Sequence, residues 1–194
     1  MNLTEMRTRV REDLQDEDEA NYRWSNDEVD GAIQRVVREF SLAYPLMEST
    51  DIATTDGSNE LDISSLSGLI AIMRVEFPIG EDPACYQRVE LWKTTLYMQD
   101  KGNGDDARVR WYKEHTLDAG SSTIPSQFEE IIVLGATGYL ATSASAYTAD
   151  RATIGGRGAT ANFLKWGQTR LELYQKKLKA LQGRIITREF YTDA

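Results

Sequence analysis

Cysteine and histidine are nearly absent from this 194-residue sequence, which has one of each, Cys85 and His115. A single cysteine excludes an intramolecular disulfide, and a single histidine excludes any metal site that needs two imidazoles from one chain. Basic residues are also scarce, because 22 Lys and Arg stand against 31 Asp and Glu, for a formal net charge of −9. The sequence therefore disfavours zinc clusters, haem attachment and proteins that hold DNA by bulk charge.

Long hydrophobic runs are missing as well. The longest apolar stretch, residues 131–141, is interrupted by two glycines and a threonine and is far shorter than the ~20 residues that cross a bilayer. The opening residues 1–14 alternate charged with apolar side chains, so we expect no signal peptide. Hydrophobic residues at 41% and charged residues at 27% are typical of a folded globular protein. We expect a soluble protein, made in a reducing compartment, with no membrane partner.

Two helices are predicted at the start of the chain. The first, over residues 2–15, follows from one apolar stripe at helical spacing: Leu3, Met6, Val10 and Leu14. Ser25, with Glu28 three residues later, has the form of a capping box. The second helix is therefore expected from about residue 26 to residue 44, and Pro45 ends it.

The pattern changes after the second helix to short segments rich in β-branched and aromatic residues, separated by turn-forming residues. Strands are predicted near residues 50–55, 60–63, 69–77, 86–92, 94–98 and 107–115. Short turns between consecutive strands favour antiparallel pairing. The sequence therefore predicts an antiparallel β region inserted into a helical frame.

Two further helices are predicted after this β region. The segment from Pro125 through Leu140 is so apolar that most of its circumference must be buried, and two glycines within it indicate a close contact with another element. The last helix is expected from about residue 159 to residue 182, and it ends at Gly183. Its buried stripe is formed by Leu164, Leu171, Tyr174, Leu178 and Leu181.

The predicted fold class is α+β, a bundle of about four helices with an inserted antiparallel β region between helices 2 and 3 and an extended C-terminal tail. The expected domains are a helical core over residues 1–46 and 118–183, the β region over 47–117 and the tail over 184–194. Charge is distributed unevenly, since residues 126–182 carry more basic than acidic side chains whereas the rest of the chain before them is acidic. The last helix is thus the basic part of an acidic protein.

Candidate catalytic and ligand-binding motifs are weak. Residues 16–19 resemble the first half of a calcium loop, but Ala20 and Asn21 stand where a ligand and a glycine are required, which favours a solvated acidic turn. The glycine-rich segment 154–158 lacks the Lys-Ser/Thr of a P-loop and follows a helix, which favours a loop between helices. The sequence therefore predicts no catalytic residue, no metal site and no cofactor.

Three sequence patterns follow one another along the chain: a helix-loop-helix at its start, a strand that leads into a helix, and a long closing helix. Residues 14–16 and 21–28 lead into the helix of residues 32–40, and residues 109–115 lead through Thr123-Ile124-Pro125 into a helix that begins at residue 129. A long closing helix with a short tail completes the chain. This layout resembles the head-to-tail connector or adaptor proteins of tailed bacteriophages, which sit beneath the portal ring and join it to the tail.

The resemblance implies a structural virion protein without enzymatic activity, synthesised in the host cytoplasm. Such a protein forms a ring, expected to be a dodecamer, that joins the portal vertex to the tail and continues the DNA channel without sequence-specific DNA binding. Its partners are then further copies of itself, the portal protein and a tail or nozzle protein.

Two groups of residues are expected to carry these contacts. The tail is expected to dock on the portal as an added extended strand, through Ile185, Ile186, Arg188, Phe190 and Tyr191. The interface with other subunits or partners is assigned to Lys165, Lys176, Lys179, Trp24 and Arg23. Two other functions stay open at this point: an intracellular α+β enzyme or ligand-binding protein with a site of carboxylates and aromatic residues, and a helical interaction module unrelated to virions.

Overall fold

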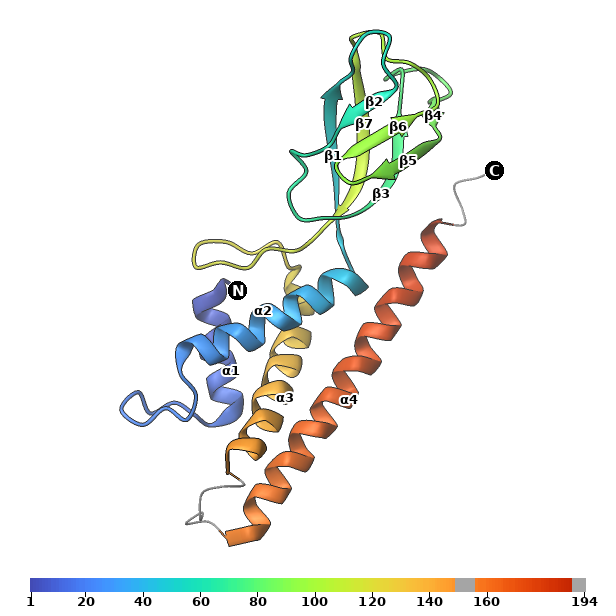
Figure 1. The fold of residues 1–194 in the computed structure, drawn as a ribbon. Coiled ribbons are helices and arrows are strands. Elements are labelled where there is room, and N and C mark those ends of the chain that lie inside the picture. Colours follow the sequence, from blue (N-terminus) through green and yellow to red (C-terminus); the bar gives the residue numbers. More distant parts are fainter. Residues whose placement is uncertain (149–155, 190–194) are drawn as a thin grey trace. The chain divides into compact units, whose positions relative to one another are not determined.

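The structure is a computed structural model that describes the backbone of residues 1–148 and 156–189 and the side chains of residues 1–143 and 162–182 (Figure 1). Internal contacts divide the chain into two compact units. The helical unit is formed by Met1–Tyr44 together with His115–Ala194, and the β unit is formed by Pro45–Glu114. Each unit has a hydrophobic core of its own.

The first two helices begin at local capping signals. Helix α1, Leu3–Leu14, starts with a capping box in which the Asn2 side chain accepts the Glu5 backbone N–H at 3.0 Å. Helix α2, Asn26–Ala43, starts with the capping box predicted at Ser25 and Glu28. It ends directly before Tyr44 and Pro45, because the residue preceding a proline disfavours the helical conformation.

The β unit is antiparallel throughout, as predicted. One sheet has the order β1-β7-β3-β4 and the other the order β2-β6-β5. The strands are β1 Leu46–Ala53, β2 Glu60–Asp62, β3 Leu69–Glu76, β4 Tyr86–Gln87, β5 Val89–Trp92, β6 Thr95–Met98 and β7 Asp106–Lys113. The strand predicted over residues 86–92 is interrupted at Arg88, and its two parts pair in different sheets.

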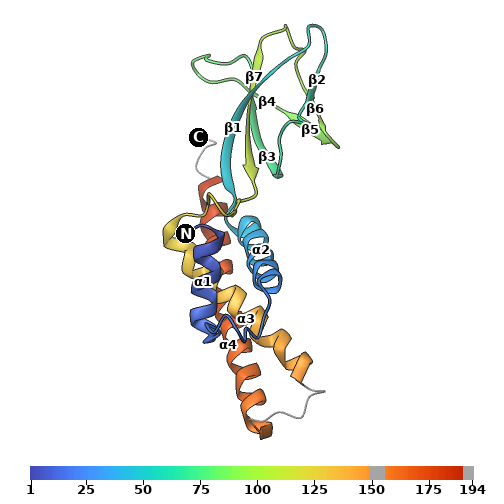
Figure 2. The ribbon, with the colours of Figure 1, turned by 90° about the vertical axis from the view of Figure 1, so that its left-hand side faces the viewer.

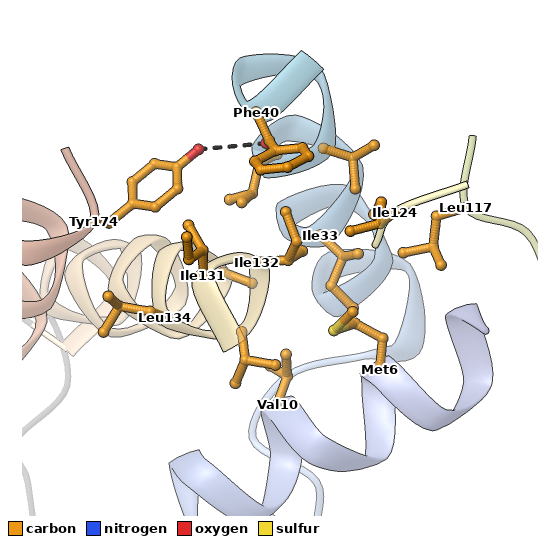
Figure 3. Close-up of a cluster of buried hydrophobic side chains, with 14 of the residues drawn as sticks. Met6, Val10, Ile33, Phe40, Leu117, Ile124, Ile131, Ile132, Leu134 and Tyr174 are labelled. Carbon is orange, nitrogen blue, oxygen red and sulfur yellow. Dashed lines mark hydrogen bonds between the residues drawn. The ribbon is translucent and has the colours of Figure 1, made fainter. Parts of the chain in front are cut away.

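Helix α3, Glu129–Thr148, is the central element of the helical unit and follows the short 3-10 helix η1, Ser126–Phe128. Its buried residues contact α1, α2 and α4, Gly156–Glu189, which explains why the helix is apolar around most of its circumference. Figure 3 shows Ile131, Ile132 and Leu134 of α3 among the side chains of the core. The buried Tyr174 hydroxyl of α4 donates a hydrogen bond to the Val36 carbonyl oxygen at 3.3 Å.

Two glycines of α3 allow its neighbours to approach closely, as predicted. A Cβ at Gly135 would lie 2.9 Å from Val36 Cγ1 and 3.0 Å from the Tyr174 ring. A Cβ at Gly138 would lie 2.9 Å from the Leu171 side chain of α4. Contacts this short are too close for a real Cβ, so the packing of α3 against α2 and α4 depends on these glycines.

The last helix is longer at both ends than predicted. It continues through Gly183 to Glu189, so the helix end at residue 182 and an extended backbone from residue 184 were wrong. A glycine inside a helix costs only about 1 kcal/mol relative to alanine and does not by itself end the helix. The helix also begins at Gly156, inside the loop predicted over residues 150–158, of which 150–155 lie outside the described residues.

Candidate interaction surfaces

The outer side of α4 carries the lysines that the sequence singled out. Lys165, Lys176 and Lys179 are exposed, and at about 100° per residue they lie within about 60° of one another around the helix. Tyr174 and Leu181, which are buried in the core, lie on the opposite side of the same helix. We refer to the three lysines as the basic face of α4.

The basic face carries more positive than negative charge, and the described residues offer it little compensation. Among the described residues, none of its lysines makes an ion pair with a carboxylate. Glu172 is the one acidic side chain of α4 between Lys165 and Lys179 and is exposed on the same side. The face is therefore net positive and available for a partner.

The loop between α1 and α2 carries the opposite charge. Its exposed carboxylates continue into the first turn of α2, and we refer to them as the acidic surface: Glu17, Asp18, Glu19, Asp27 and Glu28. Hydrogen bonds from the Asn21 side chain and the Ala20 backbone N–H lower the pKa of Asp18. Hydrogen bonds from Ser25 likewise lower the pKa of Glu28. Both groups are therefore charged at neutral pH.

Asp16 departs from the solvated turn predicted for residues 16–19. Its side chain is buried, and its Oδ2 accepts a hydrogen bond from Arg11 Nη1 at 2.6 Å. Its Oδ1 accepts the Arg23 backbone N–H at 2.7 Å. Asp16 thus holds the loop in place, and the prediction was wrong for this residue because its partner lies on α1, outside the run that was considered.

Trp24 and Arg23 lie in different environments. Trp24 is only 4% exposed, and its ring stacks on Phe163 of α4 with centroids 6.2 Å apart. The exposed Arg23 holds its guanidinium 5.4 Å from the Trp24 centroid and 5.5 Å from that of Phe163. The structure therefore places Trp24 in the core, whereas Arg23 stays accessible beside the acidic surface.

The two charged surfaces lie on different elements of the helical unit. In the view of Figure 1, α3 is drawn between α4 and the tip of the loop that joins α1 to α2. In the view of Figure 2, turned by 90°, α1 is drawn in front of α4. The end of this loop contacts α4, because Trp24 stacks on Phe163 and the Arg23 guanidinium lies 5.5 Å from the same ring.

A groove of about 540 Å³ lies between α2 and α3. Two residues of its lining, Arg35 and Tyr139, bind Glu39, which accepts hydrogen bonds from Tyr139 Oη at 2.9 Å and from Arg35 Nε at 3.1 Å. The Arg35 guanidinium covers the Tyr139 ring at 3.8 Å. Burial, together with the bond to Glu39, raises the pKa of Tyr139. These two polar groups of the lining are therefore already hydrogen-bonded to Glu39.

His115 joins the two chain segments that connect the helical unit to the β unit. Its Nε2 lies 2.9 Å from the Tyr44 carbonyl oxygen, and its Nδ1 lies 3.0 Å from the Thr123 carbonyl oxygen. Its backbone N–H donates to Ser41 Oγ at 2.9 Å. Burial lowers the pKa of the ring, although both carbonyl contacts act in the opposite direction. Thr123 Oγ1 also lies 3.1 Å from Nδ1, and these contacts together hold the ring in place.

The hairpin of β5 and β6 is a surface that sequence reasoning missed. Its tip exposes Leu91 and Trp92, and Trp92 is 64% exposed. Lys93 in the turn has a positive φ of 55°. The sequence signal for this hairpin was its two-residue polar turn, Lys93-Thr94, between two apolar segments.

The residues assigned to the docking tail are described only in part. Ile185, Ile186 and Arg188 lie on the helical backbone of α4, and their side chains are outside the described residues. Phe190 and Tyr191 lie wholly outside the described residues. Docking of this segment on a partner stays a prediction.

Comparison with known proteins gives one family. The family model described as SU10 adaptor protein matches residues 1–114, more than half of the 194-residue chain. The match covers α1, α2 and the whole β unit. None of the curated proteins matches the chain. In the described part of the chain, no helix combines the length and apolar character of a membrane span.

Proposed function

This chain belongs to the SU10 adaptor protein family, and we propose that it forms a ring that joins the portal vertex of the phage head to the tail. Family membership makes it a structural phage head–tail adaptor, located in the virion and associated with portal or tail proteins. The ring, its expected twelve copies and its role in continuing the DNA channel are our proposal.

The observation that carries this proposal is the pair of oppositely charged, exposed surfaces on different elements of the helical unit. In a closed ring of identical subunits, one patch of each copy meets a different patch of the next. The basic face of α4 and the acidic surface provide two such patches. A single chain with two unlike, unsatisfied surfaces suits repeated assembly.

The overall charge supports the proposed DNA channel. A formal net charge of −9 opposes the approach of phosphate groups and weakens non-specific DNA binding. An acidic ring would therefore let the duplex slide, whereas a strongly basic ring would hold it.

We also propose that the protein has no catalytic activity, in line with the structural character of the family. Arg35 and Tyr139, which line the groove, are already bound to the carboxylate of Glu39. Across residues 1–148 and 156–189, no group of three or more His, Cys, Asp or Glu side chains is placed to hold a metal ion. These features support a role in assembly.

Contact with the portal is assigned to the C-terminal residues Ile185, Ile186, Arg188, Phe190 and Tyr191. Among residues 162–182 of α4, whose side chains are described, the last buried core residue is Leu181, and the proposed docking segment follows it in the sequence. Apolar side chains at this end of the chain suit burial against another protein.

Reconstitution with purified portal rings tests the proposed function. The protein is mixed with portal, and the mass and the number of copies bound per portal ring are measured by native mass spectrometry and electron microscopy. We expect many copies arranged as a second ring on one face of the portal. Failure to bind, or binding of a single copy per portal ring, would overturn the proposal.

A further inference from the structure

We propose that neighbouring copies of this chain contact one another through the basic face of α4 on one copy and the acidic surface on the next. The inference rests on the proposed ring and names the residues that join its subunits. Lys165, Lys176 and Lys179 form one side of this contact. Glu17, Glu19 and Asp27 form the centre of the other side.

Charge complementarity identifies the occupant of the basic face. The face presents three exposed lysines around one glutamate, and the acidic surface presents five exposed carboxylates beside one exposed arginine, Arg23. Leu173 of α4 is 46% exposed, so apolar area is also available along the outer part of the helix. A second copy of the chain therefore offers the counter-charge that the lysines lack.

Neither surface is satisfied within its own subunit. Among the described residues, Lys165, Lys176 and Lys179 have no ion pair, and neither do Glu17, Glu19 or Asp27. Within one subunit, no ion pair among the described residues joins the lysines of α4 to the acidic surface. A contact between copies can join them.

The geometry of the two surfaces favours a repeating contact. Because the patches differ, their association is heterologous, and each added copy leaves one patch of each kind free until the ring closes. A single exposed ion pair stabilises a contact only weakly, but the same contact recurs at every subunit boundary. Salt screens such pairs, since the Debye length is about 8 Å at physiological ionic strength. Ring occupancy should therefore fall as salt is raised.

Two other partners could bind the basic face, and the charge-exchange experiment distinguishes them from a second copy of the chain. A DNA duplex is disfavoured because the net charge of −9 opposes it and only three lysines would face its phosphates. A portal surface would contact the lysines without involving the acidic surface of another adaptor copy. Only the contact between copies couples the two surfaces to each other.

A charge exchange tests the coupling directly. One variant carries Lys165→Glu, Lys176→Glu and Lys179→Glu, and the other carries Glu17→Lys, Glu19→Lys and Asp27→Lys. Each variant alone places like charges against each other at every boundary, so we expect portal occupancy to fall at least ten-fold. In an equimolar mixture, acidic faces meet basic surfaces in alternation, and we expect occupancy to return to near the wild-type value.

A control variant separates this contact from the change in net charge. Arg88→Glu, Lys93→Glu and Lys101→Glu alters three exposed basic residues of the β unit by the same charge and should bind as wild type does. Circular dichroism confirms that all variants fold. Wild-type occupancy by either single-surface variant, or no recovery in the mixture, would overturn the inference. If wild-type protein does not form multi-copy assemblies on the portal, the proposed function itself fails.

Discussion

Arg11 shows how one residue can position a surface. Its guanidinium binds Asp16, donates to the Trp24 carbonyl oxygen at 2.9 Å and lies 3.5 Å from the centroid of the Tyr22 ring. These contacts hold both ends of the loop that carries the exposed acids. A buried, multiply bonded arginine of this kind fixes backbone positions through its several N–H donors.

We expect Arg11→Met to lower the free energy of unfolding by about 3–5 kcal/mol, because the buried Asp16 carboxylate loses its counter-charge. Chemical denaturation measures the effect. Arg9→Met is the matched control, since Arg9 pairs with Glu12 at 3.1 Å on the exposed side of the same helix and should change stability by less than about 1 kcal/mol. Equal effects of the two substitutions would contradict this assignment.

His115 should make stability depend on pH. Burial lowers the pKa of the folded ring below its ordinary 6.5, so below that pH the unfolded chain takes up the proton more readily than the folded chain. The stabilisation is complete above pH 6.5 and is lost as pH falls toward the folded pKa. We therefore expect the Tm of the wild type to decline between pH 6.5 and 5.

His115→Gln should make the decline of Tm between pH 6.5 and 5 shallower. Thermal melts at several pH values compare the slopes. Asp118→Asn serves as the control, because hydrogen bonds from the Gly120 and Ser121 backbone N–H groups lower the pKa of Asp118 below 3.8 and confine its titration to more acidic solutions. Unchanged slope in the His115 variant would show that another group titrates.

The elements of the helical unit are packed around the glycines of α3. Gly135 faces Val36 of α2 and Tyr174 of α4 with no room for a methyl group. Gly31, on α2, has no atom within 4 Å of the Cβ position. Replacing each of these glycines with alanine therefore separates the effect of helix propensity on stability from the effect of close packing.

We expect Gly135→Ala to destabilise the protein by about 1–3 kcal/mol, because the added methyl group overpacks a close helix contact. Gly31→Ala should stabilise it by up to about 1 kcal/mol, since alanine is the better helix former and the site is open. Thermal denaturation of the two variants gives the comparison. A stabilising Gly135→Ala would mean that α3 is farther from its neighbours than the structure shows.

The C-terminal end of α4 separates folding from the proposed docking. Deleting residues 184–194 removes no described core residue, so we expect little change in Tm but a large loss of portal binding. A deletion of residues 175–194 also removes Leu178 and Leu181, which pack in the core, and should lower Tm. A large Tm decrease from the shorter deletion, with portal binding retained, would show that the tail is part of the fold.

At the scale of the whole molecule, the two units have separate cores. Leu61, Val75 and Val109 belong to the core of the β unit, whereas Val36 and Ile132 belong to that of the helical unit. The chain leaves the helical unit at Tyr44 and re-enters it at His115, and these two residues are joined by a hydrogen bond. The helical unit therefore closes on itself without residues 45–114.

We expect that replacing residues 45–114 with a short Gly-Ser linker yields a folded, cooperative helical unit. The His115 contact with Tyr44 brings the two junctions together, so a short linker suffices. Circular dichroism and thermal melting test the prediction. A chain that lacks a cooperative transition would show that the helical unit needs the β unit to fold.

The sequence by itself predicted the features that depend on local bonding. The Ser25–Glu28 capping box and the stop before Pro45 act through neighbouring backbone groups, so the bounds of α2 could be inferred. The exposed side of α4 followed from the spacing of Lys165, Lys176 and Lys179. The glycines of α3 also indicated close packing, because an apolar helix has little other use for them.

Only the tertiary structure decided which of these groups are buried and what they contact. Asp16 belongs to an acidic run, yet Arg11 buries it, while Glu17 and Glu19 in the same run stay exposed. Trp24 is buried because Phe163, far along the chain, stacks against its ring. The physical reason is that burial and charge pairing depend on distances between side chains in the folded chain, which the pattern of residue types does not encode.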